Sequence, residues 1–528
     1  TMPANGDSLT PTSLMLPREQ VNEKVVIIAP NNGGVGKILI REDTILTNLH
    51  GCAGCGRAQF SCGGVKSQWS ALCQMSFIGT ILFCFSNPIN DVILSNMVIR
   101  NNSMAFKLWQ YPSVQPIMKV HIFNYTNWKQ VQDGTAKKLI VKDVGPYTYA
   151  QQIERVNINF EGNLLSFQEK NGFKYIPELS AGSQLDHVNV PNLPLLVRYS
   201  IYSTFLWGYD DRIIEATKTF LSLTGMINFD RFGLLVTKNG TTSDYLTINT
   251  GVDDITRMNI IERFNGRQHL SYWGDPECNS IESSDGTIFP PSILDRKTPI
   301  YIFFPNLCRR VPFIFDSDVE TDDGVALLRY KMPSNVFDDP EHNPFNQCFC
   351  DIATGFCPPR GIANVSACVM GAPALASFPH FYLGDKKLAE DIEGINQHAV
   401  HESYIDIHPK LGIALGGKSS IQINIQVKKN PSFYILNSLE EDLILPVAYL
   451  EFSVGKLPEE IRSMIYHGTF SSAAAQLALT WCCITALIVS GICLIVIFIR
   501  RKRKPCATLR RVPAEENVLN QSNDDNIK

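Results

Sequence analysis

Two long apolar runs stand out in the pattern of hydrophobic and polar positions along the chain. The stronger run covers residues 477–499, 23 positions without a charged side chain. At about 1.5 Å per residue, a helix of this length crosses the roughly 30 Å hydrocarbon core of a bilayer. The basic cluster RRKRK follows at 500–504, and such clusters favour the cytoplasmic side. We therefore predict a transmembrane helix within 471–499 and a cytoplasmic basic tail at 500–528.

A weaker apolar run covers residues 69–89. It carries Ser70, Gln74 and Thr80 but no charge, and Pro88 stands where a helix could end or kink. A buried helix or a degraded signal sequence are the alternatives, although the run starts too far along for an ordinary cleaved signal peptide. As a second span, it would place both termini in the cytoplasm. Residues 1–68 would then be a cytoplasmic extension, and residues 90–470 one external domain.

The region between the runs shows mainly β patterns. Residues 421–427 alternate strictly between Ile or Val and Gln or Asn, which predicts a half-buried strand. Shorter β candidates cover 139–141, 301–304, 325–330 and 404–407. Frequent breaks such as Gly145-Pro146 favour an antiparallel sheet or barrel. Residues 195–224 instead have helical spacing, which predicts a helical hairpin whose aromatic side chains belong either to a core or to a surface.

Cysteines and sequons support an external location for 90–470. Of the chain's 15 cysteines, six lie between the two runs, all within 278–368. An even number in an external region predicts three disulfides, and 15 pairings are possible. A zinc site is the alternative, because Cys348, Cys350 and Cys357 are close together, but no second CxxC accompanies them. Four sequons predict N-glycosylation, and they begin at Asn101, Asn124, Asn239 and Asn364.

Composition and charge exclude some classes of protein. The 528 residues include 47 Lys and Arg against 51 Asp and Glu, for a net charge of −4, and 45% are hydrophobic. These values exclude a mainly disordered chain, and a near-neutral charge gives no indication of nucleic-acid binding. From Arg500 onward, eight basic and four acidic residues give the tail +4, so the rest of the chain carries −8.

Catalytic and metal-binding motifs are mostly incomplete. The stretch from Asn31 resembles a P-loop, but Ile38 occupies the Ser/Thr position that meets Mg²⁺. The acidic stretch from Asp318 lacks the glycine and final glutamate of an EF-hand. His50 with three nearby cysteines is an irregular metal candidate. We predict no enzymatic activity, no cofactor and no metal site, and a membrane-anchored hydrolase is the competing class.

Several motifs between the runs resemble those of one family. They are MAFKLW at 104–109, VGPYTY at 144–149, LWGY at 206–209, LSYW at 270–273, GTIFPP at 286–291, FPHF at 378–381 and YIDI at 404–407. As a set, over roughly residues 91–500, they resemble the CD36 / class B scavenger receptor family. That family also includes the lysosomal integral membrane protein type 2 and insect sensory-neuron membrane proteins.

The resemblance implies an α+β membrane protein. Its large antiparallel, β-barrel-like ectodomain would carry an apical helical bundle from 195–224 and an internal hydrophobic tunnel, between two transmembrane helices. It implies the disulfides Cys278–Cys348, Cys308–Cys368 and Cys350–Cys357. It also implies an apical ligand site, for which we select Arg198, Tyr202, Phe205, Leu206, Trp207, Tyr209, Arg212, Lys218 and Phe220.

The implied function is that of a receptor for lipoproteins, long-chain fatty acids or modified phospholipids that passes lipid to the membrane. Each CH₂ removed from water gains about 0.8 kcal/mol. A lipid path should therefore be apolar, with charge only at its mouth. The alternative is a lysosomal carrier for a luminal protein, or an adhesion receptor, with a protein ligand at the apical helices. A homo-oligomer is also compatible with the resemblance.

The C-terminal tail bears on location, and the N-terminal region departs from the family pattern. The tail carries only half of an acidic dileucine signal at 515–520, which favours the plasma membrane over the lysosome. Cys506 is a candidate palmitoylation site. Residues 1–68 are longer than the usual cytoplasmic extension, and a misassembled 5′ gene model is one explanation. Sequencing the transcript end would test it.

Overall fold

The structure is a computed structural model that describes residues 62–112, 114–191, 238–351, 355–369, 372–427, 438–455 and 457–502. The predicted apical segment 195–224 with all its candidate ligand residues, Cys506, and residues 1–61 lie outside the described residues. The chain divides into two units, Thr1–Gln68 and Trp69–Lys528, and the fold described below is that of the second.

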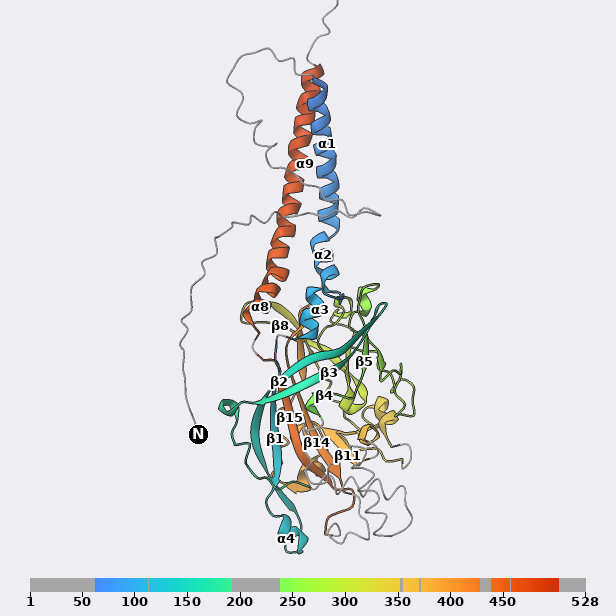
Figure 1. Cartoon of the computed structure of the whole chain (residues 1–528), viewed down its shortest axis with the longest axis vertical. Coiled ribbons are helices and arrows are strands. Elements are labelled where there is room, and N and C mark those ends of the chain that lie inside the picture. Colours follow the sequence, from blue (N-terminus) through green and yellow to red (C-terminus); the bar gives the residue numbers. More distant parts are fainter. Residues whose placement is uncertain are drawn as a thin grey trace, which may run out of the picture. The chain divides into compact units, whose positions relative to one another are not determined.

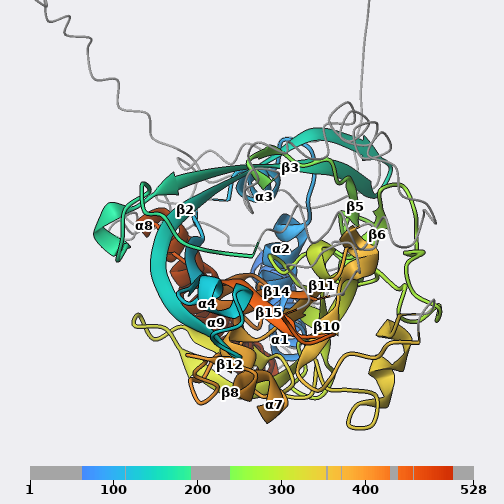
Figure 2. The same cartoon turned by 90° about the horizontal axis from the view of Figure 1, so that it is seen from below.

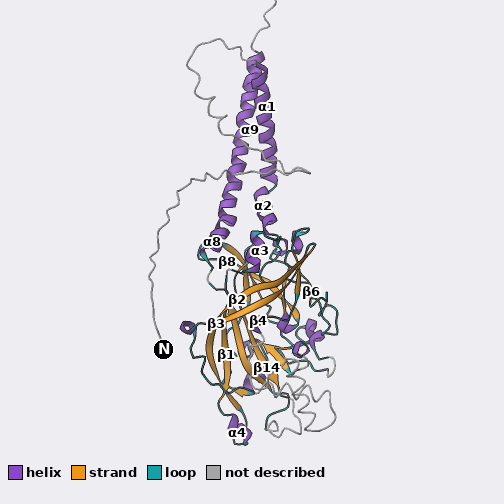
Figure 3. Cartoon of the chain, in the orientation of Figure 1, coloured by secondary structure: helices purple, strands orange, loops and turns teal. Residues whose placement is uncertain are grey.

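Within the described residues, two helical stretches are long and apolar enough to span a membrane, Gln68–Phe85 and Glu459–Arg500. The first belongs to α1 (Cys62–Phe85), which is followed by α2 (Pro88–Met97) and α3 (Met104–Gln110). The second region consists of α8 (Glu459–Tyr466), a π-helical turn (His467–Ser471) and α9 (Ser472–Lys502). Figures 1 and 3 show these helices in sequence colours and by secondary structure.

The predicted run at 69–89 is one helix and the start of another. Helix α1 ends at Phe85, and Pro88 takes the first position of α2. Proline lacks the N–H that a continuous helix needs, but its fixed φ suits a first turn. The Asn87 side chain caps the new helix by accepting a hydrogen bond from Asn90 N at 3.2 Å.

Helices α1 and α9 contact each other directly (Figure 1). A Cβ added at Gly79 would lie 2.9 Å from Cys483 Sγ, so the glycine permits a close approach of the two helices. Near the end of α1, Gln476 Nε2 donates to the Phe83 carbonyl at 3.1 Å. This bond satisfies a carbonyl in the last turn of α1, where intrahelical donors run out.

The body is built on a 15-stranded, mainly antiparallel sheet. Its main order is β6-β5-β3-β2-β1-β15-β14-β13-β9-β8-β7. The strands are β1 (Ile117–Tyr125), β2 (Leu139–Glu161), β3 (Leu164–Tyr175), β4 (Gly240–Thr241), β5 (Leu246–Asn249), β6 (Ile261–Phe264), β7 (Ile300–Phe304), β8 (Arg309–Glu320), β9 (Ala326–Lys331), β10 (Ile362–Asn364), β11 (Ala374–Ser377), β12 (Ile392–Glu393), β13 (Tyr404–Ile407), β14 (Ala414–Gln426) and β15 (Ile444–Ser453). Short helices include α4 (Trp128–Gln132), α7 (Lys386–Glu390) and the 3₁₀ turn η9 (Pro379–Phe381).

All five predicted β segments overlap strands, namely β2, β7, β9, β13 and β14, and none extends more than one residue beyond its strand. The antiparallel sheet is therefore confirmed. The prediction at 139–141 covered only the start of β2, which continues through Gly145-Pro146 to Glu161. Those two residues usually break a strand, and here they coincide with a shift of register between β1 and β2.

The two ends of the sheet come together at Ser284. This residue forms a bridge to Ile260, which directly precedes β6, and another to Ile302 in β7. The Phe264 ring of β6 lies 5.1 Å from the Phe303 ring of β7. The ends of the path are thus joined by one residue, as in a barrel-like sheet. Seen from below, β2 and β3 pass around one side of the body, and β14 and β15 lie nearer its middle (Figure 2).

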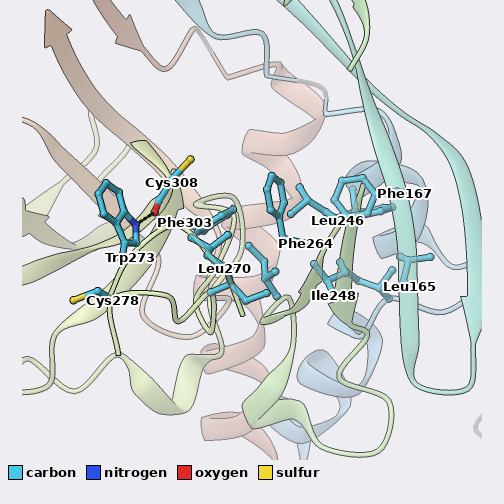
Figure 4. Close-up of a cluster of buried hydrophobic side chains, with 14 of the residues drawn as sticks. Leu165, Phe167, Leu246, Ile248, Phe264, Leu270, Trp273, Cys278, Phe303 and Cys308 are labelled. Atoms are coloured by element: carbon cyan, nitrogen blue, oxygen red, sulfur yellow. Dashed lines mark hydrogen bonds between the residues drawn. The ribbon is translucent and has the colours of Figure 1, made fainter. Parts of the chain in front are cut away.

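One buried apolar cluster extends to the disulfide-rich region (Figure 4). Trp273 Nε1 donates to the Cys308 carbonyl at 2.7 Å within it. The structure contains the disulfides Cys278–Cys348, Cys308–Cys368 and Cys350–Cys357, the pairs that the resemblance implies. These bonds use the sulfurs that the zinc alternative would need.

Candidate functional site: two faces of the central strands

The polar side chains of β14 are buried. Gln422 and Asn424 are 0% exposed and Gln426 is 4% exposed. On the other face, Ile421 and Ile423 are only half-buried, and Ile425 and Val427 are buried. The pattern predicted a half-buried strand, in which the polar side would face water. That prediction is wrong for the polar side, because folded segments cover it.

Each of these buried amides has partners. Gln422 Oε1 accepts from the His380 backbone N–H at 2.7 Å, and its Nε2 donates to Asn424 Oδ1 at 2.7 Å. Asn424 Nδ2 donates in turn to Ser377 Oγ at 2.9 Å. A buried amide without partners would be costly, so these bonds make the covered polar side possible. They also fix the position of η9 against β14.

Charged side chains continue this polar side onto the neighbouring strands. We call His121, Asp143, His380, His401, Lys418, Tyr449 and Glu451 the polar network. Asp143 Oδ2 accepts from the Tyr449 hydroxyl at 2.7 Å, and Asp143 Oδ1 lies 3.1 Å from His121 Nδ1. His380 Nε2 lies 3.3 Å from Asp143 Oδ2. One carboxylate thus joins β1, β2, β15 and η9.

Hydrogen bonding fixes the tautomer of His380. Its Nδ1 accepts from the Asn396 backbone N–H at 3.2 Å, so that nitrogen carries no proton. The remaining nitrogen, Nε2, then carries the hydrogen that is donated to Asp143. His380 is therefore a neutral imidazole that links the 396 backbone to the carboxylate.

The second carboxylate of the network is Glu451. Its Oε1 lies 3.1 Å from Lys418 Nζ and 3.5 Å from His401 Nδ1. His401 and Lys418 outweigh burial and lower the pKa of Glu451 to about 2. Glu451 is therefore an anion at any physiological pH.

The other two acidic groups of the network shift in opposite directions. For Asp143, burial would raise the pKa, but hydrogen bonds from His121, His380 and Tyr449 outweigh it and lower the pKa well below its usual range. Burial and the Asp143 carboxylate raise the pKa of Tyr449. The Tyr449 hydroxyl thus stays protonated and is a poor nucleophile. The network has the residue types of an acid–base site but no activated hydroxyl.

The opposite side of the same strands is apolar and only partly covered. We call Met118, Val120, Ile122, Val144, Tyr147, Tyr149, Phe173, Tyr175, Leu450 and Phe452 the apolar face. Three of the ten are buried, and seven keep part of their surface exposed. On β15, Leu450 and Phe452 of this face alternate with Tyr449 and Glu451 of the polar network.

The apolar face is continuous because the strand register aligns its members. Leu450 is opposite Val120, which is opposite Tyr147. Phe452 begins a second row, in which Met118 and Tyr149 lead to Tyr175 on β3. Cross-strand neighbours contact one another within each row. The result is one apolar surface across four strands, of the kind that binds an apolar partner.

A third feature joins the sheet to the C-terminal helices. His408, directly after β13, has Nε2 at 2.8 Å from Thr469 Oγ1 in the π-helical turn. Its Nδ1 accepts from the backbone N–H groups of Lys410 and Leu411 at 3.2 and 3.1 Å. Burial, with Lys410 nearby, lowers the pKa of His408 to about 4. His408 is thus a neutral link between the body and the π-helical turn that precedes α9.

Comparison with known proteins decides the family. A sequence model described as the CD36 family matches residues 69–500. The chain belongs to the CD36 family. Among its relatives, Lysosome membrane protein 2 of Homo sapiens is 30% identical over 429 residues, which cover 76% of this chain and 87% of the relative. Scavenger receptor class B member 1 of Mus musculus is 27% identical over 428 residues, or 74% and 82% of the two chains.

The motifs that resemble the CD36 family meet in the structure. Asp143 directly precedes VGPYTY, and FPHF contributes His380, although the two residues are 237 positions apart. In MAFKLW, Trp109 packs against the buried Arg155, whose guanidinium carbon lies 4.6 Å from the ring centre. Arg155 Nη2 also donates to Asp285 Oδ2 at 2.9 Å. The motifs themselves contain only His380 and Trp109 of these residues, whereas Asp143, Arg155 and Asp285 lie outside them. The motifs therefore indicated one partner of each contact but not the other.

The predicted glycosylation sites differ in access. Asn101 and Asn239 are exposed, and Asn124 is half-buried. Asn364 is 6% exposed in β10, and its Oδ1 accepts from the Ser366 backbone N–H at 3.0 Å. Glycosylation remains a prediction for this CD36-family chain, and burial makes Asn364 the weakest of the four sites.

Proposed function

We propose that the chain is a membrane-anchored lipid receptor, which binds lipoproteins, long-chain fatty acids or modified phospholipids and passes lipid to the bilayer. The observation that carries this proposal is the partly exposed apolar face across β3, β2, β1 and β15. A relative named as a scavenger receptor, covered over 82% of its length, supports the receptor class. The apolar face would form part of the wall of the proposed hydrophobic tunnel.

The placement of charge is consistent with this role. An acyl chain gains about 0.8 kcal/mol for each CH₂ that leaves water. The sheet directs the charged network to the side opposite the apolar face, so a lipid on that face meets no carboxylate or ammonium group of the network. Lipid transfer would then need only a concentration difference and no covalent step.

The two candidate spans would anchor the body at both ends, with the basic tail in the cytoplasm and the plasma membrane as the site of action. The lysosomal membrane is the alternative location, because Lysosome membrane protein 2 is among the relatives at 30% identity. In that location, the receptor would serve as a carrier for a luminal protein. Surface biotinylation of expressing cells distinguishes the two locations.

A bulky substitution tests lipid transfer. We expect Val144→Trp to lower uptake of labelled long-chain fatty acid by expressing cells several-fold, because the indole would fill the apolar face. The matched control is Val400→Trp, since Val400 is 65% exposed in a loop. Surface amounts of both variants must equal that of the wild type.

Mass spectrometry of lipid that copurifies with the full chain provides a second measurement. We expect bound lipid in the wild type and in Val400→Trp, and much less in Val144→Trp. Equal uptake and equal bound lipid in all three proteins would contradict transfer. Labelled lipoprotein that failed to bind expressing cells would favour the protein-carrier alternative.

A further inference from the structure

Four histidines on or near β1, η9 and β13 differ in the hydrogen bonds that their ring nitrogens make. They are His121, His380, His401 and His408. His380 and His408 each accept a backbone N–H at Nδ1 and pair with an oxygen through Nε2. A second proton on either ring would break an existing hydrogen bond. His121 shares its Nδ1 between Asp143 and Tyr449. Of the four, only His401 is buried with neither ring nitrogen in a hydrogen bond of normal geometry, and its nearest acceptor is Glu451 Oε1 at 3.5 Å.

His401 is also placed beside a carboxylate. It is 9% exposed, and its Nδ1 lies 3.5 Å from Glu451 Oε1, at the outer limit of a hydrogen bond. The rings of His380 and Tyr449 are 5.8 and 5.7 Å away, and that of Tyr382 is 6.5 Å away. Nε2 has no partner whether or not the ring is protonated. Nδ1–H can point to Glu451 in either state, but only the protonated ring forms an ion pair with that carboxylate.

Charged and titratable groups from several elements surround His401. Glu451 and Tyr449 of β15, and His380 and Tyr382 of the η9 region, lie next to His401. Lys418 of β14 contacts the same Glu451 oxygen. Asp143 of β2 and His121 of β1 lie farther along the network, where both contact the Tyr449 hydroxyl. With neutral imidazoles, two carboxylates and one ammonium give the network a charge of −1, so one added proton makes it neutral. Lys418 opposes the proton, but it is already paired with Glu451 at 3.1 Å.

We propose that His401 and Glu451 form a proton-dependent ion pair, which fastens residues 396–403 onto β15 when the surroundings become acidic. The step is a proton transfer from solvent to the imidazole, with no other bond made or broken. Glu451 lies between Leu450 and Phe452 of the apolar face on the same strand. The ion pair would therefore restrict the motion of β15, which carries residues of both the polar network and the apolar face.

The experiment is amide hydrogen exchange of residues 396–403 in the full chain, reconstituted in phosphatidylcholine nanodiscs. Rates at pH 7.5 and pH 5.0 are corrected for the intrinsic effect of pH. In the wild type, we expect corrected exchange to slow roughly tenfold at pH 5.0, because the ion pair with Glu451 holds the segment on β15. His398→Gln, an exposed histidine of the same segment, should behave as the wild type does.

Two variants should abolish the acid effect for different reasons. His401→Gln removes the proton acceptor, and Glu451→Gln keeps the imidazole but removes its anionic partner. If either variant fails to fold, the other still tests the pair. Equal corrected exchange at both pH values in the wild type would overturn the proposal, as would an acid effect that survives Glu451→Gln.

Discussion

The polar network and the apolar face occupy opposite sides of the same strands. The side that is more fully covered is the polar one, which is the reverse of an ordinary half-solvated sheet. In such a sheet, polar side chains meet water and apolar ones pack. Here the amides of β14 are fully covered, whereas seven of ten members of the apolar face remain partly exposed. Alternation along a strand thus shows that two faces differ, but it does not show which one is covered.

The difference has an energetic meaning. A covered polar side is stable only when nearly every donor and acceptor finds a partner, so its members should tolerate little change. The seven partly exposed members of the apolar face gain less from burial, and they should tolerate truncation better. The network therefore specifies the geometry of the strands, and the apolar face is available for a partner. Four predictions test this contrast.

The largest effect is expected at Asp143. Asp143→Ala would leave His121, His380 and Tyr449 without their shared acceptor, and we expect the free energy of unfolding to fall by about 4 kcal/mol. The matched control, Asp253→Ala, changes an exposed carboxylate and should cost below about 0.5 kcal/mol. Urea unfolding of the full chain in detergent measures both. A loss below about 1 kcal/mol at Asp143 would show that the network contributes little.

The second effect depends on pH and concerns Glu451. Its pKa is lowered in the folded state to about 2, so the stability it contributes is fully present above the unfolded value near 4.5. That contribution falls as pH drops from about 4.5 to 2, by about 3 kcal/mol in total. We expect Glu451→Gln to flatten this part of the stability curve, and Leu450→Ala on the apolar face to leave it unchanged.

Urea unfolding at several pH values between 2 and 5 measures these slopes. Other carboxylates also titrate in this range, so the informative quantity is the difference between wild type and variant. A difference that did not change with pH would mean that Glu451 is solvated in the folded chain.

The third effect compares neighbours on β14. Gln422→Met keeps the side-chain length but leaves the His380 N–H and Asn424 Oδ1 unpaired, and we expect a loss of about 2 kcal/mol. Ile423→Met, one position along on the half-buried side, should cost below about 1 kcal/mol. Thermal unfolding of the two variants shows which substitution destabilises the chain more. The reverse order would mean that the polar side is the more tolerant one.

Much of the fold, but less of the site, was predictable from the sequence. The alternation at 421–427 predicted β14, and charge-free runs predicted α1 and α9, because periodicity and length are local properties. The disulfide pairs came only from the family resemblance, since six cysteines allow 15 pairings. The closure at Ser284 and the contact of His380 with Asp143 join distant segments, which no local pattern encodes. Burial of Gln422 depended on such contacts, and this is why its side of the strand was misjudged.

The smallest effect on stability, expected at Leu450, most directly separates packing from ligand binding. Leu445 and Leu450 both lie on β15, but Leu445 is buried and Leu450 is half-buried on the apolar face. We expect Leu445→Ala to cost about 3 kcal/mol and Leu450→Ala only about 1 kcal/mol, because an open site leaves no closed cavity. Lipid that copurifies with the full chain should follow the opposite order, reduced by Leu450→Ala and retained by Leu445→Ala. If bound lipid instead fell in proportion to stability in both variants, the apolar face would be ordinary core, and its partial exposure would have no role in binding.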